Sequence, residues 1–194
     1  MKNIRQLREI MQESSLPSLV VVPGPNMSYL TGSKFHLSER PVVLVIEQNK
    51  CTFILPELES AKILNLDVDC ITYNDKDGPV KAFNKFAKDN SFSTIGIESR
   101  TIRHLELDLL QTTGITTNFV DAIDIFAQLR MSKSEEEKEF MIKAVEIAQK
   151  SLESILHKIK PGITEAICIR FDNRITSKRF RIRTAIFSDS CFCS

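Results

Sequence analysis

The feature that most constrains the fold is a series of short apolar runs, rich in β-branched residues, that alternate with segments of helical spacing. The runs lie at residues 19–22, 42–46, 51–55, 70–73, 94–97 and 117–120. Between the later runs lie segments with helical spacing, at residues 57–64, 80–88 and 101–112. Strands that alternate with helices predict a largely parallel sheet that is covered on both faces. We therefore expect an α/β domain with a sheet of five or six strands and flanking helices.

One pair of runs departs from this alternation. Residues 42–46 and 51–55 are separated only by the polar tetrapeptide EQNK, which is typical of an antiparallel hairpin. The hairpin makes the predicted sheet mixed. An opening helix is predicted over residues 4–13, and a short helix after the first strand, with Pro25 suited to its start and Gly32 to its end.

A second region begins at Ser134. Ser134 and Glu137 form a capping-box pattern, three glutamates occupy the first helical turn, and Pro161-Gly162 suits a helix stop. The pattern predicts one long helix over residues 134–159. Its apolar face needs a partner, and the sheet already has enough helices, so we expect this helix to open a second domain.

Several motifs resemble one family when they are taken in their order along the chain. They are NMSYLTG, FHLSERP, ILPELE, YND, IGIES, LRMSKSEEEKEFMIKAVEIA and KIKPGITE. This series is similar to the N-terminal half of the Xaa-Pro aminopeptidase and prolidase family of metallopeptidases. The family's YLTG corresponds to residues 29–32, its LR-x-x-K-S-x-x-E segment to residues 129–137, and its PG-x-TE segment to residues 161–165.

The resemblance implies a two-domain enzyme that hydrolyses the peptide bond before proline. Residues 1–125 would form a creatinase-like N-terminal domain, residues 126–133 a linker, and residues 134–166 the first helix of a "pita-bread" catalytic domain. That catalytic domain holds two divalent metals, usually manganese, cobalt or zinc, through two aspartates, a histidine and two glutamates. Such hard cations need several carboxylates to bridge them and to activate a water molecule.

This ligand set is missing from the remainder of the chain. Past Gly162 there are three carboxylates, and the three histidines all come earlier. These residues are Glu165, Asp172, Asp189, His36, His104 and His157. We therefore predict a truncated catalytic domain, with no catalytic residue and no metal in this chain, and no hydrolytic activity of the chain alone.

Residues 167–194 depart from the family pattern, and we interpret them as a non-family tail, disordered and derived from a frameshift or truncation. The tail is basic, but isolated basic runs are more often solvated surface, and a net charge of +1 gives no reason to expect a nucleic acid or membrane partner. A zinc site from Cys168, Cys191, Cys193 and His157 would rest on a weak ligand pattern, and incidental thiols are the favoured interpretation. The absence of a signal peptide or membrane-spanning pattern favours the cytoplasm.

The segment after YLTG supplies the candidate binding residues. In dimers of the resembled family, the N-terminal domain of one subunit can reach the active site of the other. Phe35, His36 and Arg40 would then contact a short peptide in trans through an aromatic face, a titratable ring and a carboxylate-binding fork. The alternative is that Phe35 and Tyr29 are core residues, that His36 lies in a loop, and that Arg40 pairs with an acid such as Glu39. Tyr29 and Gly32 are predicted to be fold-forming.

Two acidic patterns and two other functions stay open as alternatives. Residues 75–78 weakly resemble a calcium loop, but a solvated loop is favoured because the regular ligands are missing. Asp67, Asp69, Asp121 and Asp124 could form the carboxylate cluster of a metal-dependent nuclease, or serve as loop and cap residues. The chain could also be a non-catalytic module for homodimerisation or peptide binding, or a gene fragment without function.

Overall fold

The computed structural model describes residues 3–156 and 159–162 of the chain. Contacts divide the chain into two units, Met1–Ser132 and Lys133–Ser194. In the described residues, no helix is both long enough and apolar enough to cross a membrane.

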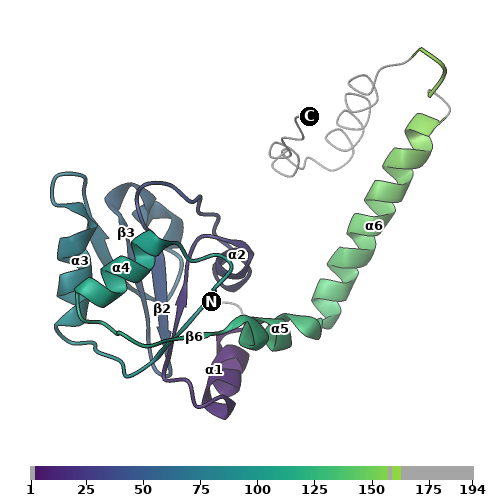
Figure 1. Ribbon diagram of the computed structural model, residues 1–194. Coiled ribbons are helices and arrows are strands. Elements are labelled where there is room, and N and C mark those ends of the chain that lie inside the picture. The colour runs from purple at the N-terminus through teal and green to yellow at the C-terminus, as the bar shows by residue number, and fades with distance from the viewer. Residues whose placement is uncertain (1–2, 157–158, 163–194) are drawn as a thin grey trace. The chain divides into compact units, whose positions relative to one another are not determined.

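The first unit is built on a mixed six-stranded sheet, as the alternating apolar runs predict (Figure 1). The strands are β1 (Ser18–Val21), β2 (Val43–Glu47), β3 (Cys51–Pro56), β4 (Asp69–Tyr73), β5 (Ile95–Ile97) and β6 (Phe119–Asp121). Their order across the sheet is β4-β3-β2-β1-β5-β6. The pairs β1–β2 and β2–β3 are antiparallel, and the other pairs are parallel. Strand β2, inside the sheet, thus runs opposite to its neighbours β1 and β3, and the other strands share one direction.

Helices cover both faces of this sheet (Figure 1). They are α1 (Ile4–Glu13), α2 (Pro25–Thr31), the 3-10 helix η1 (Glu57–Ile63), α3 (Gly78–Ala87), α4 (His104–Thr112) and α5 (Ile123–Met131). One hydrophobic core joins the sheet to α1, α2, η1 and α5, and a second core joins the opposite face to α3 and α4. Successive strand residues point to opposite faces, so Leu44 belongs to the first core and Val45 to the second. A central strand that is buried on both faces is apolar without interruption, which is the pattern that β2 shows.

Gly96 allows the side chains of Leu16 and Leu19 to pack closely against β5. A Cβ atom at this position would clash with Leu16 Cδ2, and it would lie 2.9 Å from Leu19 Cδ1 and 3.3 Å from Ala122 Cβ. Ala122 directly precedes α5 and is fully buried. The space left by the missing side chain of Gly96 is therefore filled mainly by Leu16 and Leu19, with Ala122 next to them.

The structure differs from the predicted domain boundary at α5. The sequence analysis places residues 126–133 in a linker, but α5 extends to Met131, and Phe126 and Leu129 are buried in the first core. The compact unit accordingly runs to Ser132 rather than to residue 125. The reason is that the apolar residues of α5 pack, together with those of α1, in the first hydrophobic core.

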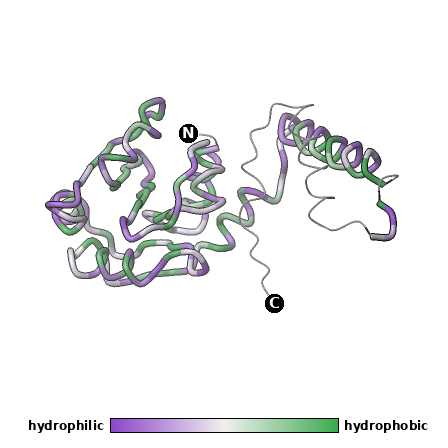
Figure 2. Tube along the Cα trace, turned by 90° about the horizontal axis from the view of Figure 1, so that it is seen from above, coloured by the Kyte–Doolittle hydropathy of each residue, from purple (hydrophilic) through white to green (hydrophobic). Residues whose placement is uncertain are grey.

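The described part of the second unit consists mainly of helix α6, Glu135–Leu156. Its start is the predicted capping box: the Ser134 amide donates to Glu137 Oε2 at 3.0 Å, and the Glu137 amide donates to Ser134 Oγ at 3.2 Å. Apolar residues recur along α6 (Figure 2), but several are open to solvent, with Phe140 59% and Val145 66% exposed. The predicted tail, residues 167–194, lies outside the described residues.

Candidate functional site

The carboxyl ends of β1 and β5 form a switch point in the sheet. These two strands are parallel neighbours, yet β1 leads into α2 on one face and β5 leads towards α4 on the other. Ligands of open α/β sheets usually bind at such points. Here the two loops are in contact, because a Cβ on Gly24 would lie 3.2 Å from Thr101 Cγ2. The loops that follow β1 and β5 therefore pack against each other at this point.

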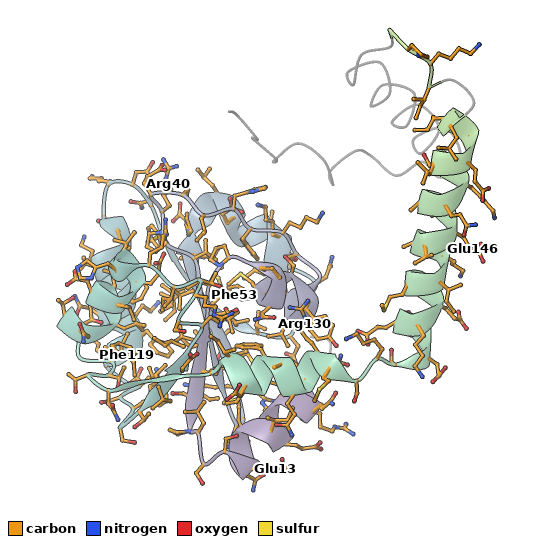
Figure 3. The ribbon with its side chains drawn as sticks, turned by 45° about the vertical axis from the view of Figure 1, so that its right-hand side comes forward. Glu13, Arg40, Phe53, Phe119, Arg130 and Glu146 are labelled. Atoms are coloured by element: carbon orange, nitrogen blue, oxygen red, sulfur yellow. The ribbon has the colours of Figure 1, made fainter. Side chains whose placement is uncertain are left out.

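A buried carboxylate organises this switch point. Glu98, directly after β5, is only 4% exposed. Asn26 Nδ2 donates to Glu98 Oε1 at 2.6 Å, and Arg130 Nη1 donates to Asn26 Oδ1 at 2.8 Å. Burial raises the pKa of Glu98, while the Asn26 hydrogen bond, the Val22 amide and the charge of Arg130 oppose this rise. The network joins β5, α2 and the last turn of α5, where Figure 3 labels Arg130.

Tyr29 of the YLTG motif has a structural role, as the fold-forming interpretation predicts. Asn3 Nδ2 donates to the Tyr29 hydroxyl at 2.6 Å, and the Arg130 guanidinium lies over its ring, 5.6 Å from the centroid. Gly32 ends α2 with a φ of 71°, in the left-handed region that glycine adopts at least cost. The motif thus fixes α2 against the start of the chain and against α5.

The three predicted substrate contacts, Phe35, His36 and Arg40, lie in different environments. Phe35 is 7% exposed and belongs to the first core, where its ring packs 5.6 Å from that of Phe53, which Figure 3 labels. Its side chain is therefore not available to a ligand at the surface of this domain, and the burial corresponds to the alternative interpretation of Phe35. His36 is exposed on the loop that follows.

Arg40 lies in an exposed ion pair rather than free at the surface. Its Nε and Nη2 donate to the two carboxylate oxygens of Asp75 at 2.7 and 2.8 Å, and Nη1 lies 3.0 Å from Glu39 Oε1. The hydrogen bonds from Arg40 lower the pKa of Asp75. A pairing with Glu39 is the predicted alternative for Arg40. Asp75 is the partner that the sequence did not reveal.

Further hydrogen bonds hold the backbone of the loop between α2 and β2. Arg103 Nη1 donates to the Ser38 carbonyl oxygen at 2.6 Å, while the same side chain forms an ion pair with the buried Glu106. The Tyr73 hydroxyl donates to the Pro41 carbonyl oxygen at 2.7 Å. Burial of the Tyr73 phenol raises its pKa. His36 and Arg40 therefore project from a loop whose backbone is held by α4 and β4.

The acidic residues considered as metal ligands do not come together. Asp69 lies in β4 and Asp121 in β6, which are opposite edges of the sheet. Asp121 instead accepts hydrogen bonds from Ser99 Oγ and the Ile123 amide, and Asp77 pairs with Lys81. Among the described residues, no three His, Cys, Asp or Glu side chains are placed to hold a metal ion. This part of the chain therefore does not fit a two-metal centre, a nuclease cluster or a calcium loop.

The thiols in the described residues are those of Cys51 and Cys70, and both are free. Cys51 is buried beside Arg8, whose Nη2 lies 3.5 Å from its sulfur, and burial raises the pKa of the thiol. A hollow of about 270 Å³ next to it is lined by Arg8 and Lys50 but also by Asp67 and Asp69, so its charge favours neither anions nor cations. The predicted alternative zinc ligands Cys168, Cys191, Cys193 and His157 lie outside the described residues.

The sequence analysis missed the network of Glu98, Asn26 and Arg130. All three residues lie within motifs that carry the resemblance, IGIES, NMSYLTG and LRMSKSEEEKEF. A signal was present in Glu98, a carboxylate directly after an apolar strand, because buried charges need partners. The partners, however, lie 72 positions away at Asn26 and 32 at Arg130, a distance that local patterns do not span.

Comparison with known proteins agrees with this architecture. The family model of the creatinase/prolidase N-terminal domain matches residues 3–132. An Xaa-Pro dipeptidase from Pyrococcus horikoshii is 23% identical over 171 residues, which cover 84% of this chain and 44% of that protein. The chain thus spans less than half the length of this curated relative.

Two solved structures show the same fold. A prolidase from Thermococcus sibiricus has a TM-score of 0.81 at 20% identity, over 92% of this chain and 50% of that one. A creatinase N-terminal superfamily domain of a dipeptidase from Streptococcus thermophilus has a TM-score of 0.60 at 21% identity, over 67% of this chain and 99% of that one. The family model covers more than half of the chain, and the sheet, helices and strand order are those of an α/β N-terminal domain. The chain belongs to the creatinase/prolidase N-terminal domain family.

Proposed function

We propose that this chain supplies the N-terminal domain of a proline-specific metallopeptidase of the Xaa-Pro dipeptidase type, and that it does not hydrolyse peptides by itself. The observation that carries the proposal is the match of residues 3–132 to the N-terminal domain, with a chain that spans about half of its prolidase relatives. The part of the chain that the structure describes has no cluster of metal ligands, so the divalent metals of the resembled family would be held by residues other than those described.

The experiment is an activity assay on the purified full chain. It is incubated with Mn²⁺, Co²⁺ or Zn²⁺ and an Xaa-Pro dipeptide, and proline release is measured. We expect no turnover above that of an identically purified Phe53→Ala variant, whose sheet domain is destabilised. Turnover that needs the metal, disappears with a chelator and is lost in the variant would overturn the proposal.

His36 and Arg40 are proposed to contact the peptide across the N-terminal-domain interface of a dimer whose other subunit is complete. The support is that His36 is exposed and that Arg40, four positions later on the same loop, presents a half-exposed guanidinium, while Arg103 and Tyr73 hold the loop backbone. Arg40 would exchange the Asp75 or Glu39 carboxylate for that of the peptide. Phe35 would support the loop from within the core.

The test uses a mixed dimer of this chain with a complete Xaa-Pro dipeptidase subunit. Replacing His36 or Arg40 by alanine in this chain should raise KM at the complete subunit and leave kcat nearly unchanged, because contacts made equally in the ground and transition states affect KM. Leu37→Ala, at an exposed position on the same loop, is the control. Failure of the chains to form a mixed dimer, or an unchanged KM, contradicts this part of the proposal.

The free thiols Cys51 and Cys70 are compatible with a cytoplasmic location, which we propose on that ground.

A further inference from the structure

The loop that carries His36 and Arg40 contains no helix or strand between Gly32 and the start of β2. Figure 3 labels Arg40 on this loop. An irregular loop that becomes ordered only when a ligand binds loses conformational entropy, and this loss weakens binding. The affinity of the proposed peptide contact therefore depends on what holds the loop in place before the peptide arrives.

One anchor of the loop begins at a buried carboxylate in α4. Glu106 lies in the first turn of α4 and is fully buried. Its Oε2 accepts the Arg103 amide at 3.1 Å, and its Oε1 accepts Arg103 Nε at 3.1 Å, with Arg103 Nη2 as a further donor. A buried carboxylate needs such partners, so the pair holds the Arg103 side chain in one orientation.

The third nitrogen of the Arg103 guanidinium reaches the loop. Nη1 donates to the Ser38 carbonyl oxygen at 2.6 Å, although the two residues lie 65 positions apart. Capping of α4 requires only the bonds between Arg103 and Glu106, so the bond to Ser38 is an additional one. Because the guanidinium is planar and its donors form a fixed fork, the pair with Glu106 also sets the direction of Nη1.

Ser38 is bonded in turn to Arg40. The Arg40 amide donates to Ser38 Oγ at 3.2 Å. On the other side of Ser38, the ring of Phe35 is buried in the first core. His36 therefore lies between a buried ring and a backbone position that Arg103 holds. The bond from Arg103 thus acts on the part of the loop from which His36 and Arg40 project.

We propose that Arg103 is a positioning residue for the peptide contact of His36 and Arg40. Glu106 fixes the guanidinium, and the guanidinium fixes the loop backbone at Ser38. This inference rests on the contact across the dimer interface that is proposed above. When the loop is ordered in advance, binding of the peptide costs less conformational entropy, so Arg103 lowers KM without touching the peptide.

The test is Arg103→Lys in the mixed dimer of this chain with a complete Xaa-Pro dipeptidase subunit. The lysine ammonium can still pair with Glu106, which protects the fold, but it lacks the fork that reaches Ser38 at the same time. We expect KM at the complete subunit to rise about 3- to 10-fold, the range that the loss of one hydrogen bond gives, with kcat nearly unchanged. Arg100→Lys, at an exposed position between β5 and α4, is the matched control and should leave KM unchanged.

A second measurement on the full chain alone does not depend on the proposed peptidase function. Backbone order parameters from ¹⁵N relaxation should fall at residues 36–40 in Arg103→Lys and stay as in the wild type in Arg100→Lys. The thermal unfolding midpoint should be nearly the same in all three proteins. Unchanged order parameters in Arg103→Lys, or a lower midpoint with an unchanged KM, would overturn the positioning role.

The kinetic results separate this inference from the contact on which it rests. Arg103→Lys combined with His36→Ala should raise KM by less than the product of the two separate effects, because Arg103 acts through the loop that carries His36. If His36→Ala and Arg40→Ala raise KM and Arg103→Lys does not, the positioning role is wrong and the proposed contact stands. If none of the three substitutions changes KM, both are wrong.

Discussion

The sheet domain and helix α6 contain the same kinds of apolar residue, but most of those of the sheet domain are buried and many of those of α6 are exposed. Phe53 lies in the middle of β3 and is fully buried, whereas Phe140 of α6 is 59% exposed. In the sheet domain, helices close both faces of the sheet, so nearly every apolar strand residue finds partners within the same unit. The comparison shows that the first unit has its own complete core, whereas many apolar side chains of α6, among them Phe140, Val145 and Leu152, are exposed.

The largest expected difference between the two regions comes from one substitution made in each. Phe53→Ala should lower the free energy of unfolding of the sheet domain by about 3–5 kcal/mol, because it removes a buried ring and leaves a cavity. Phe140→Ala should change this free energy by less than about 0.5 kcal/mol. Urea denaturation followed by a probe of the sheet domain measures both. Equal effects of the two substitutions would mean that the domain and α6 unfold as one cooperative unit.

Asn26→Ala tests how firmly α5, the last helix of the sheet domain, is attached. The substitution removes the hydrogen bonds to Glu98 and Arg130 and leaves the buried carboxylate without its amide partner. We expect a loss of about 1–3 kcal/mol in the free energy of unfolding. The matched control is Asn49→Ala, at an exposed position of the β2–β3 turn, which should have little effect. An equally stable Asn26→Ala protein would show that the network does not hold α5 in place.

Ser134→Ala should act on α6 and not on the sheet domain. It removes the hydroxyl that accepts the Glu137 amide at the helix start, which is worth about 1 kcal/mol of helix stability. Amide exchange in residues 135–140 should become faster, while exchange in β2 and β3 stays unchanged. Ser154→Ala, inside α6, is the control and should not produce this loss. Faster exchange throughout the sheet would contradict the independence of the two regions.

The smallest expected effect is a pH dependence of the sheet domain that comes from Glu98. Its pKa is raised in the folded state by burial, so between the ordinary carboxyl pKa and the raised one, the folded state binds a proton that the unfolded state does not. This contribution increases stability as the pH falls through that window.

The lowered pKa of Asp75 has the opposite sign, because its contribution is present above the unfolded pKa and is lost as the pH falls. The urea midpoint at pH 7 and at about pH 5 should therefore show less stabilisation at low pH in Glu98→Gln than in the wild type. Asp75→Asn should respond as the wild type does over this range, because the contribution of Asp75 is lost only as the pH falls below its unfolded pKa. An identical pH response in the wild type and Glu98→Gln would contradict the role of Glu98.

The elements of the fold could be predicted because their signals are local. The six apolar runs, the hairpin at EQNK, the capping box at Ser134 and the stop at Gly32 each depend on residues within a few positions of one another. The resemblance to the prolidase family came from the order of such local motifs, and the match to residues 3–132 confirms it. The linker prediction failed because burial of Phe126 and Leu129 depends on α1, which is more than 100 positions away.

The candidate site could be predicted only in part. The sequence indicated Phe35, His36 and Arg40 by their residue types and their position after YLTG. It could not show that the Phe35 side chain is buried, whereas the side chains of His36 and Arg40 reach the surface. Chemical type does not determine burial, which depends on what the rest of the chain places around a side chain.

The sequence by itself thus determined the alternation of strands and helices, the family, and the presence of a long capped helix, because these are properties of neighbouring residues. Only the tertiary structure decided that Phe35 is a core residue, that Arg40 pairs with Asp75, and that Glu98 is linked to Arg130 through Asn26. The physical reason is that burial and hydrogen-bond partnership are set by packing between segments far apart in the chain, and no local pattern contains that information.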